Sequence, residues 1–264
     1  MNKKQIIFYV VLSLLLILFI VLSVLSIKEI KNRISSSKSM ENIYEFDGSS
    51  PFSINKILYF SSANCNTEIT SNSSFKILDL YQYTDIAIFL NNNADGNFTA
   101  ENTLKKVTLS DIKFSLTPSI GTPNLYFKNI NDFTSNNYDE NKKIENTLDF
   151  ATSSEDEIDY SNPILFNNCA NPITLCYVNS SLITDYTLTD NASNISYNGS
   201  LLKNCGITLN SIACKLSFLI TITNNLDEVY TCPLTLTIPL STESSTIYDG
   251  SLILTDNTNY QFIK

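Results

Sequence analysis

The sequence from Cys214 to Leu240, CKLSFLITITNNLDEVYTCPLTLTIPL, contains the clearest secondary-structure pattern of the chain. Apolar residues occupy every second position on both sides of a polar segment, at 214, 216, 218, 220 and 222 and again at 232, 234, 236, 238 and 240. This period of two predicts two β-strands that each bury one face. The polar segment from Asn224 to Asp227 predicts the turn between them, so we expect an antiparallel hairpin.

The same period recurs through much of the chain. The sequence ILDLYQYTDIAIFL, residues 77–90, is rich in β-branched and aromatic residues, and TLKKVTLSDIKFSL, residues 103–116, alternates apolar with polar positions. Further strand-like segments lie at residues 57–61, 124–127, 173–178, 183–188, 195–197, 201–209, 247–254 and 260–263. We therefore expect an all-β region of antiparallel strands in a sandwich-like arrangement.

Composition divides this β-rich region into two blocks, residues 44–150 and 163–264. The segment between them, residues 151–162, has few apolar residues and carries four acidic side chains, Glu155, Asp156, Glu157 and Asp159. Such a segment is typical of an acidic linker between domains. The sequence IAIFLNN at 86–92 resembles LITITNN at 219–225, which favours two tandem immunoglobulin-like modules. A single long sandwich is the alternative.

An uncharged apolar segment precedes the β-rich region. The sequence IIFYVVLSLLLILFIVLSVLSI, Ile6 to Ile27, has 22 residues. At about 1.5 Å per residue it reaches roughly 33 Å, enough to span a hydrocarbon core of about 30 Å. We expect a transmembrane α-helix that contacts the lipid bilayer as an uncleaved signal anchor, with residues 1–5 as a cytoplasmic tip and 28–43 as a stalk. A cleaved signal peptide is the alternative interpretation.

The charges beside this segment favour neither orientation clearly. Lys3 and Lys4 precede it, while Lys28, Lys31 and Arg33 follow it. Positive residues on the C-terminal side oppose export, but long domains are translocated largely regardless of loop charge. A basic pair before an apolar segment is also how export signals begin. We therefore expect a single-pass protein of the cell membrane with its C-terminal region extracytoplasmic.

The composition excludes several kinds of chemistry. The chain contains no His and one Arg, Arg33, and residues 39–264 carry 25 acidic and 11 basic residues, a net charge of −14. A surface this acidic repels phosphate backbones, so we expect no nucleic-acid partner. Without His, Ser-His-Asp and Cys-His catalysis are excluded. We expect a protein that is not an enzyme and has no cofactor.

The chain has six cysteines, Cys65, Cys169, Cys176, Cys205, Cys214 and Cys232. An even number in an exported β protein predicts disulfides, although six cysteines allow 15 pairings and their spacing does not select one. Buried thiols are the alternative. A hairpin centred near Asn225 places Cys232 opposite Leu219, so the hairpin itself does not join Cys232 to Cys214.

One loop resembles the first half of a calcium-binding loop. Oxygen-bearing side chains stand at Asn91, Asn93 and Asp95, and Gly96 follows at the sixth position. The twelfth position is Asn102, where a calcium loop needs a bidentate Glu. An Asp-Gly hairpin turn explains the same residues, so we expect the turn and keep calcium as the alternative.

These features favour a membrane-anchored bacterial surface protein whose exported β region acts as a binding, adhesion or envelope-structural module with a protein or glycan partner. One alternative is a pilin-like assembly subunit, although the Gly-Phe-Thr processing site of pilins is missing. Another is an exported carboxylate-dependent hydrolase. An exposed aromatic cluster would stack on sugars, but aromatic residues that alternate along strands are expected in the core.

Overall fold

The structure is a computed structural model that describes residues 50–69, 75–182, 187–188, 200–239, 241–242, 245–246, 250–254 and 260–264. Ser49–Lys264 form one compact unit. The expected membrane anchor from Ile6 to Ile27, the tip at residues 1–5 and the stalk at residues 28–43 lie outside the described residues. Within the described ranges, every helix is too short or too polar to cross a membrane.

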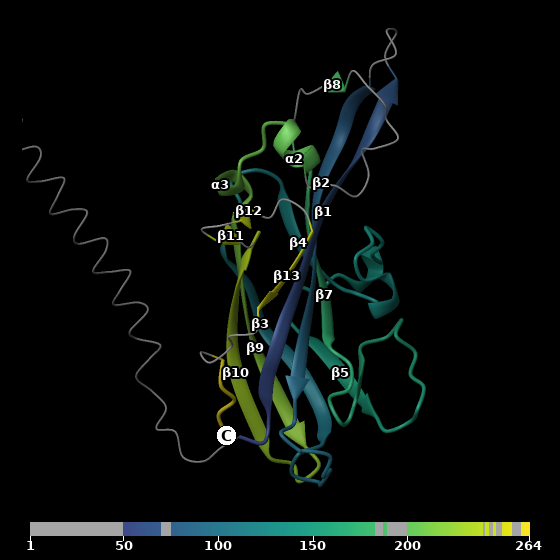
Figure 1. The fold of residues 1–264 in the computed structure, drawn as a ribbon, viewed down its shortest axis with the longest axis vertical. Coiled ribbons are helices and arrows are strands. Elements are labelled where there is room, and N and C mark those ends of the chain that lie inside the picture. The colour runs from purple at the N-terminus through teal and green to yellow at the C-terminus, as the bar shows by residue number, and fades with distance from the viewer. Residues whose placement is uncertain are drawn as a thin grey trace, which may run out of the picture. The chain divides into compact units, whose positions relative to one another are not determined.

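The first sheet is antiparallel and contains the two longest strands of the fold (Figure 1). Its order is β13-β1-β2-β7-β4, and β8 (Thr187–Leu188) pairs with the beginning of β2. The five strands in that order are β13 (Gly250–Leu254), β1 (Ser53–Ile69), β2 (Phe75–Asn91), β7 (Ile173–Ser180) and β4 (Thr122–Phe127). β1 and β2 pair along almost their whole length, from Ser53 opposite Asn91 to Ile69 opposite Phe75.

The second sheet is mixed, with the order β10-β9-β3-β5-β6. Its strands in that order are β10 (Val229–Ile238), β9 (Cys214–Asn224), β3 (Leu104–Leu116), β5 (Leu148–Ser153) and β6 (Ile164–Phe166). The β5–β6 pair is parallel and the other pairs are antiparallel. The remaining short elements are η1 (Ile130–Asp132), η2 (Glu140–Lys142), α2 (Ser200–Asn204), α3 (Leu209–Ile212) and the pair β11 (Ser241–Thr242) and β12 (Ser245–Thr246). The expected all-β fold is confirmed.

The hairpin expected from the opening sequence is formed by β9 and β10, and burial alternates along both strands. Its register differs from the expected one, because Cys232 lies opposite Ile220 rather than Leu219. The turn runs from Asn224 to Glu228, whose backbone carbonyl accepts a 3.0 Å hydrogen bond from the Asn224 N–H. This longer turn moves the second strand by one residue relative to the first.

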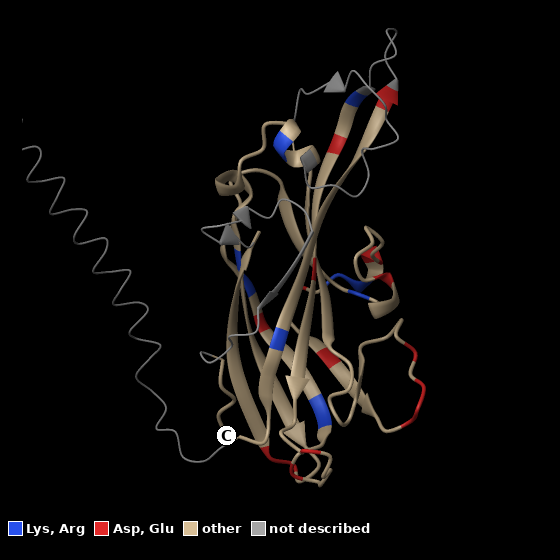
Figure 2. Cartoon of the chain, viewed as in Figure 1, with Lys and Arg blue, Asp and Glu red and all other residues tan. Residues whose placement is uncertain are grey.

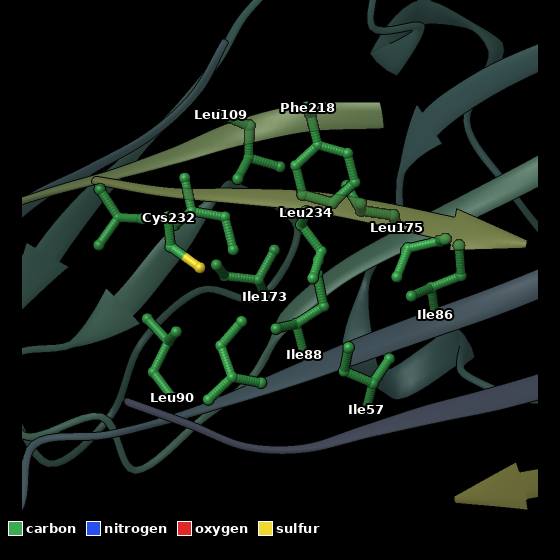
Figure 3. Packing of buried hydrophobic residues seen from close by; sticks show 14 of the residues in the cluster. Ile57, Ile86, Ile88, Leu90, Leu109, Ile173, Leu175, Phe218, Cys232 and Leu234 are labelled. Atoms are coloured by element: carbon green, nitrogen blue, oxygen red, sulfur yellow. The ribbon is translucent and has the colours of Figure 1, made fainter. Parts of the chain in front are cut away.

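The main hydrophobic core lies between the two sheets and takes side chains from both. Ile88 and Leu175 of the first sheet point toward Leu109, Phe218 and Leu234 of the second (Figure 3). Because alternate side chains of a strand point to opposite faces, the strands of both sheets contribute one apolar phase to this core.

The division into two β-rich domains, 44–150 and 163–264, is wrong for this fold. β3 of the first block lies between β9 and β5, and β7 and β13 of the second block belong to the first sheet. Residues 151–162 contain the end of β5 and the loop to β6, so they are not an interdomain linker. The main core takes apolar side chains from both sheets, so the two sheets cover each other and form a single sandwich.

Two local expectations also need correction. The turn at Ala94–Asn97 exists, with the Asn97 N–H 2.6 Å from the Ala94 carbonyl, but it connects β2 to β3 in different sheets and closes no hairpin. Residues 201–209 were expected as a strand and instead contain most of α2 and the beginning of α3. Leu201, Leu202 and Ile207 pack there against Leu80 in a second, smaller hydrophobic cluster.

The segment 260–264 closes one side of the sandwich by pairing with both sheets. Gln261 forms a bridge with Ser53 of β1, and Ile263 forms one with Thr231 of β10. The Thr231 N–H donates to the Ile263 carbonyl at 2.8 Å, and the Ile263 N–H returns a bond of 2.9 Å. Between these bridges, Phe262 is buried in the main core.

Candidate functional site

Tyrosines gather on the outer face of the first sheet, the face away from the main core. Along β2, Ile86 and Ile88 point into the core, whereas Tyr83 in the opposite phase belongs to a separate cluster with Tyr126 of β4 and Cys176 of β7. Tyr83 and Tyr126 are buried, as expected of aromatic residues in strands, but in this separate cluster rather than in the main core.

A loop between β4 and β5 covers part of this outer face and supplies a further tyrosine. Within this loop, Asn129 caps η1 by accepting from the Asn131 N–H at 2.9 Å, and Asp139 caps η2 by accepting from the Asn141 N–H at 2.9 Å. Such caps satisfy backbone donors that the first turn leaves unpaired. They fix the loop on either side of Tyr138.

The strands and the loop enclose an open hollow of about 610 Å³, called the tyrosine pocket below. Its walls are aromatic and polar, and they carry one acidic and one basic side chain. The lining residues are Asn64, Asn66, Tyr81, Tyr83, Tyr126, Tyr138, Glu140, Lys143, Ser180 and Ser181.

The tyrosine rings contact one another in a continuous row. The ring centroids of Tyr126 and Tyr138 are 4.6 Å apart, those of Tyr83 and Tyr138 are 6.0 Å apart, and those of Tyr81 and Tyr83 are 6.1 Å apart. Burial, with Tyr126 nearby, raises the pKa of Tyr138 to about 12. Burial also raises the pKa of the other three tyrosines. All four phenols are therefore neutral at physiological pH and can donate hydrogen bonds.

A buried ion pair fixes the covering loop to the sheet. Lys128 follows β4, and its Nζ lies 3.1 Å from Oδ2 of Asp85 on β2, with both side chains at most 2% exposed. The same Nζ donates to the backbone carbonyls of Ser135 at 2.8 Å and Asn137 at 2.6 Å. The ion pair and these hydrogen bonds hold the loop against the sheet next to Tyr138.

The carboxylate of Asp85 also receives a hydrogen bond from the loop backbone. The Thr134 N–H donates to Asp85 Oδ2 at 2.8 Å, and Thr134 has a φ of 69°. A positive φ is costly for a β-branched residue and persists only where surrounding contacts impose it. Burial raises the pKa of Asp85 to about 6, against the opposing effect of the Lys128 charge.

The calcium candidates lie near the end of β2, where Asn91 and Asn93 hydrogen-bond to each other. The Asn91 Nδ2 donates to Asn93 Oδ1 at 2.8 Å, and Ser53 Oγ donates to the same oxygen at 3.2 Å. Asp95 is exposed in the turn that follows. The described ranges contain no group of three or more Cys, Asp or Glu residues arranged to hold a metal ion.

The six cysteines are all described, and no disulfide joins any of them. Cys65 and Cys205 pack against the same smaller cluster, and burial together with the neighbouring Cys205 raises the pKa of Cys65 to about 11. Cys214 and Cys232 lie in the main core. In the β9–β10 hairpin, Cys214 lies opposite Ile238 and Cys232 lies opposite Ile220. Cys169 packs at the edge of that core, and Cys176 lies beside Asp85 in the sheet register.

The acidic residues Glu155, Asp156, Glu157 and Asp159 are exposed in the loop between β5 and β6 (Figure 2). Asp159 accepts from the Ser161 N–H and from Asn162 Nδ2, both at 2.9 Å, and so shapes the end of this loop. A second hollow of about 750 Å³ lies near this loop and is lined largely by β5 and the beginning of β6, including Phe150 and Ile164. It has no row of aromatic rings, so we place the candidate site at the tyrosine pocket.

The sequence interpretation missed Asp85, Lys128 and Tyr138. Asp85 was detectable, because it is a charged residue within the apolar strand sequence TDIAIF and shares its phase with Tyr81 and Tyr83. Lys128 and Tyr138 lie in or beside a loop without periodicity, so no pattern identified them. Comparison of the chain with protein-family models, curated proteins and solved structures finds no match.

Proposed function

We propose that this chain is a membrane-anchored surface protein whose β-sandwich binds carbohydrate in the tyrosine pocket. The observation that carries the proposal is the pair of partly exposed rings of Tyr81 and Tyr138, which pack on the buried Tyr83 and Tyr126 beside asparagine and serine side chains in an open hollow. Aromatic rings stack on the apolar faces of sugars, and neutral amides and hydroxyls bond to sugar hydroxyl groups.

The pocket is better suited to a neutral ligand than to a charged one. Glu140 and Lys143 contribute one charge of each sign to the lining. A phosphate or a strongly basic peptide would need a concentration of opposite charge. A sugar needs rings and hydrogen-bonding groups, which this lining supplies.

Binding rather than hydrolysis is proposed because of the number of carboxylates. Glycoside hydrolysis generally uses two carboxyl groups on either side of the scissile bond. Among the described residues that line the pocket, Glu140 supplies the one carboxylate. The described lining of the pocket therefore lacks the paired acid and base that the hydrolase alternative requires.

The proposed scaffold class is immunoglobulin-like, and the strand order supports it. The immunoglobulin arrangement has strands A, B, E and D in one sheet and G, F and C in the other. The orders β1-β2-β7-β4 and β10-β9-β3 correspond to these two series. In this correspondence, β5 and β6 extend the second sheet beyond strand C, and β13 extends the first sheet beyond strand A.

The membrane location rests on the apolar segment from Ile6 to Ile27 and the orientation on the export-like N-terminus. Protease treatment of intact cells tests both. Degradation of the β-sandwich without opening the membrane is expected, and protection of the β-sandwich until the membrane is opened would contradict export.

A glycan array probed with the full chain in detergent tests the ligand class. We expect retention of at least one glycan and about tenfold weaker binding by the Tyr138→Ala variant, equivalent to about 1.4 kcal/mol. Phe98→Ala is the matched control, because Phe98 is 54% exposed and does not line the pocket. No retained glycan, or equal effects of the two variants, would contradict carbohydrate binding in this pocket.

A further inference from the structure

We propose that Lys128 and Asp85 condense to an amide bond between Nζ and Cγ, which covalently joins β2 to the residue that follows β4. The product would be an intramolecular cross-link over β7, the strand between β2 and β4. The inference is independent of the ligand proposed above.

Proximity and exclusion of water are the first arguments. Nζ and Oδ2 lie 3.1 Å apart, and the exposed fractions of the Lys128 and Asp85 side chains are 0% and 2%. Holding two reacting groups in contact removes much of the entropic barrier to their reaction. A site without water also protects the amide product from hydrolysis.

The energetic cost of the unreacted pair favours condensation. Two charges buried away from water each lose several kcal/mol of solvation, which their mutual attraction offsets only in part. Asp85 Oδ1 is buried and has no hydrogen-bond partner within the described part of the chain. A neutral amide removes both charges and this unpaired oxygen.

The condensation can be written with the atoms of Lys128, Asp85 and Thr134 alone. A proton passes from the Lys128 ammonium to Asp85 Oδ1, which gives a neutral amine and a carboxylic acid. The amine then attacks Cγ, while the Thr134 N–H stabilises the negative charge that develops on Oδ2, 2.8 Å away. A second proton moves from Nζ to Oδ1, the Cγ–Oδ1 bond breaks, and Oδ1 leaves as water.

The surroundings also fit the product. The amide oxygen keeps its hydrogen bond from Thr134, and the amide N–H can donate to the carbonyl of Ser135 or Asn137, the present acceptors of Nζ. Burial raises the pKa of Asp85 to about 6, which favours the proton transfer that the first step needs.

The molecule contains an internal control. Lys106 Nζ and Asp149 Oδ2 lie 3.0 Å apart, but their side chains are 53% and 58% exposed. Water solvates both charges of this pair, so the energetic argument for condensation does not apply to it. We expect this exposed pair to remain an ordinary ion pair.

Tryptic peptide mapping of the purified, denatured full chain by mass spectrometry tests the cross-link. We expect residues 77–105 joined to 114–142, with a mass one water below the sum of the two peptides and no cleavage after Lys128. Cleavage after Lys106 should proceed normally. Release of the unmodified peptide 114–128 as the main product would overturn the proposal.

The Lys128→Arg variant separates this reaction from other losses of water. It keeps a buried cation beside Asp85 but removes the nucleophilic amine. The measured mass of this variant should therefore equal the mass calculated from its sequence, without the loss of one water. Mass is measured on denatured protein, so the wild-type result stands whether or not the variant folds. A water loss that persists in Lys128→Arg, for example through succinimide formation at Asp95 and Gly96, would overturn the assignment to Lys128.

Discussion

The Ser62 hydroxyl donates a 2.6 Å hydrogen bond to Asn136 Oδ1, which connects β1 to the loop that covers the first sheet. Ser62 is buried, and Asn136 Nδ2 has no hydrogen-bond partner among the described residues. Ser62→Ala would leave both ends of the Asn136 amide unpaired, at a cost of about 1–3 kcal/mol. We expect faster amide hydrogen exchange in residues 133–138 and a lower free energy of unfolding.

Ser53→Ala is the matched control for this effect. Ser53 Oγ donates to Asn93 Oδ1 at 3.2 Å in an exposed position, where water replaces the lost partner. Its loss should change the free energy of unfolding by less than about 0.5 kcal/mol. Equal effects of the two serines would show that the loop is not held by Ser62.

The Phe262→Ala substitution tests whether segment 260–264 closes the sandwich. Phe262 is 2% exposed and packs in the main core, so truncation to Ala should cost about 3–5 kcal/mol. Urea unfolding followed by tyrosine fluorescence measures the change. Leu226→Ala is the control, because this side chain is 55% exposed, and it should change the free energy of unfolding by less than about 0.5 kcal/mol. A similar loss in both variants would contradict the proposal that segment 260–264 closes the sandwich.

The fold class was predictable from sequence, because a period of two reports directly which side chains of a strand are buried. Cys214, Phe218 and Ile222 share a phase in the sequence and lie in the same core in the structure. The period does not report which strands are neighbours. Lys106 of β3 pairs with Thr223 of β9, and nothing in either strand identifies the other. This is why two domains were expected where one sandwich forms.

The candidate site was predictable only for its strand residues. The phase shared by Tyr81, Tyr83 and Asp85 distinguishes the outer face of β2 from its core face. Tyr138 reaches that face through the contacts of Lys128 with Asp85 and with the loop carbonyls. These contacts join segments distant in sequence, and the loop has no period from which they could be inferred.

Glu228 should make the stability of the protein depend on pH in the acidic range. Lys264 Nζ at 2.5 Å, Asn224 Nδ2 at 3.0 Å and Tyr230 OH at 2.9 Å lower its pKa from 4.5 to about 2. A lowered pKa in the folded state stabilises the fold above the unfolded pKa. This contribution is lost as the pH falls from about 4.5 through about 2.

The melting temperatures of the wild type and Glu228→Gln, measured from pH 6 to pH 2, test this contribution. The wild type should be the more stable at pH 6, and the difference should shrink as the pH approaches 2. High salt should reduce the difference as well, because the Lys264 contact is partly exposed. A difference that does not change between pH 6 and pH 2 would contradict the role of the carboxylate charge.

Alanine substitutions at Gly121 and Gly96 can be compared to separate the cost of a positive φ from the cost of crowding by neighbouring atoms. Their φ angles are 85° and 84°, so alanine is strained at both positions, by about 1–2 kcal/mol. A Cβ at Gly121 would overlap Asn179 Oδ1 and lie 2.7 Å from Leu182 Cδ2, whereas a Cβ at Gly96 would meet nothing within 4 Å. Asn179 and Leu182 are buried, which limits how far they can move. We expect Gly121→Ala to lower the free energy of unfolding, measured in urea, by about 1–3 kcal/mol more than Gly96→Ala does. Equal losses in the two variants would show that the turn before β4 tolerates the added methyl group.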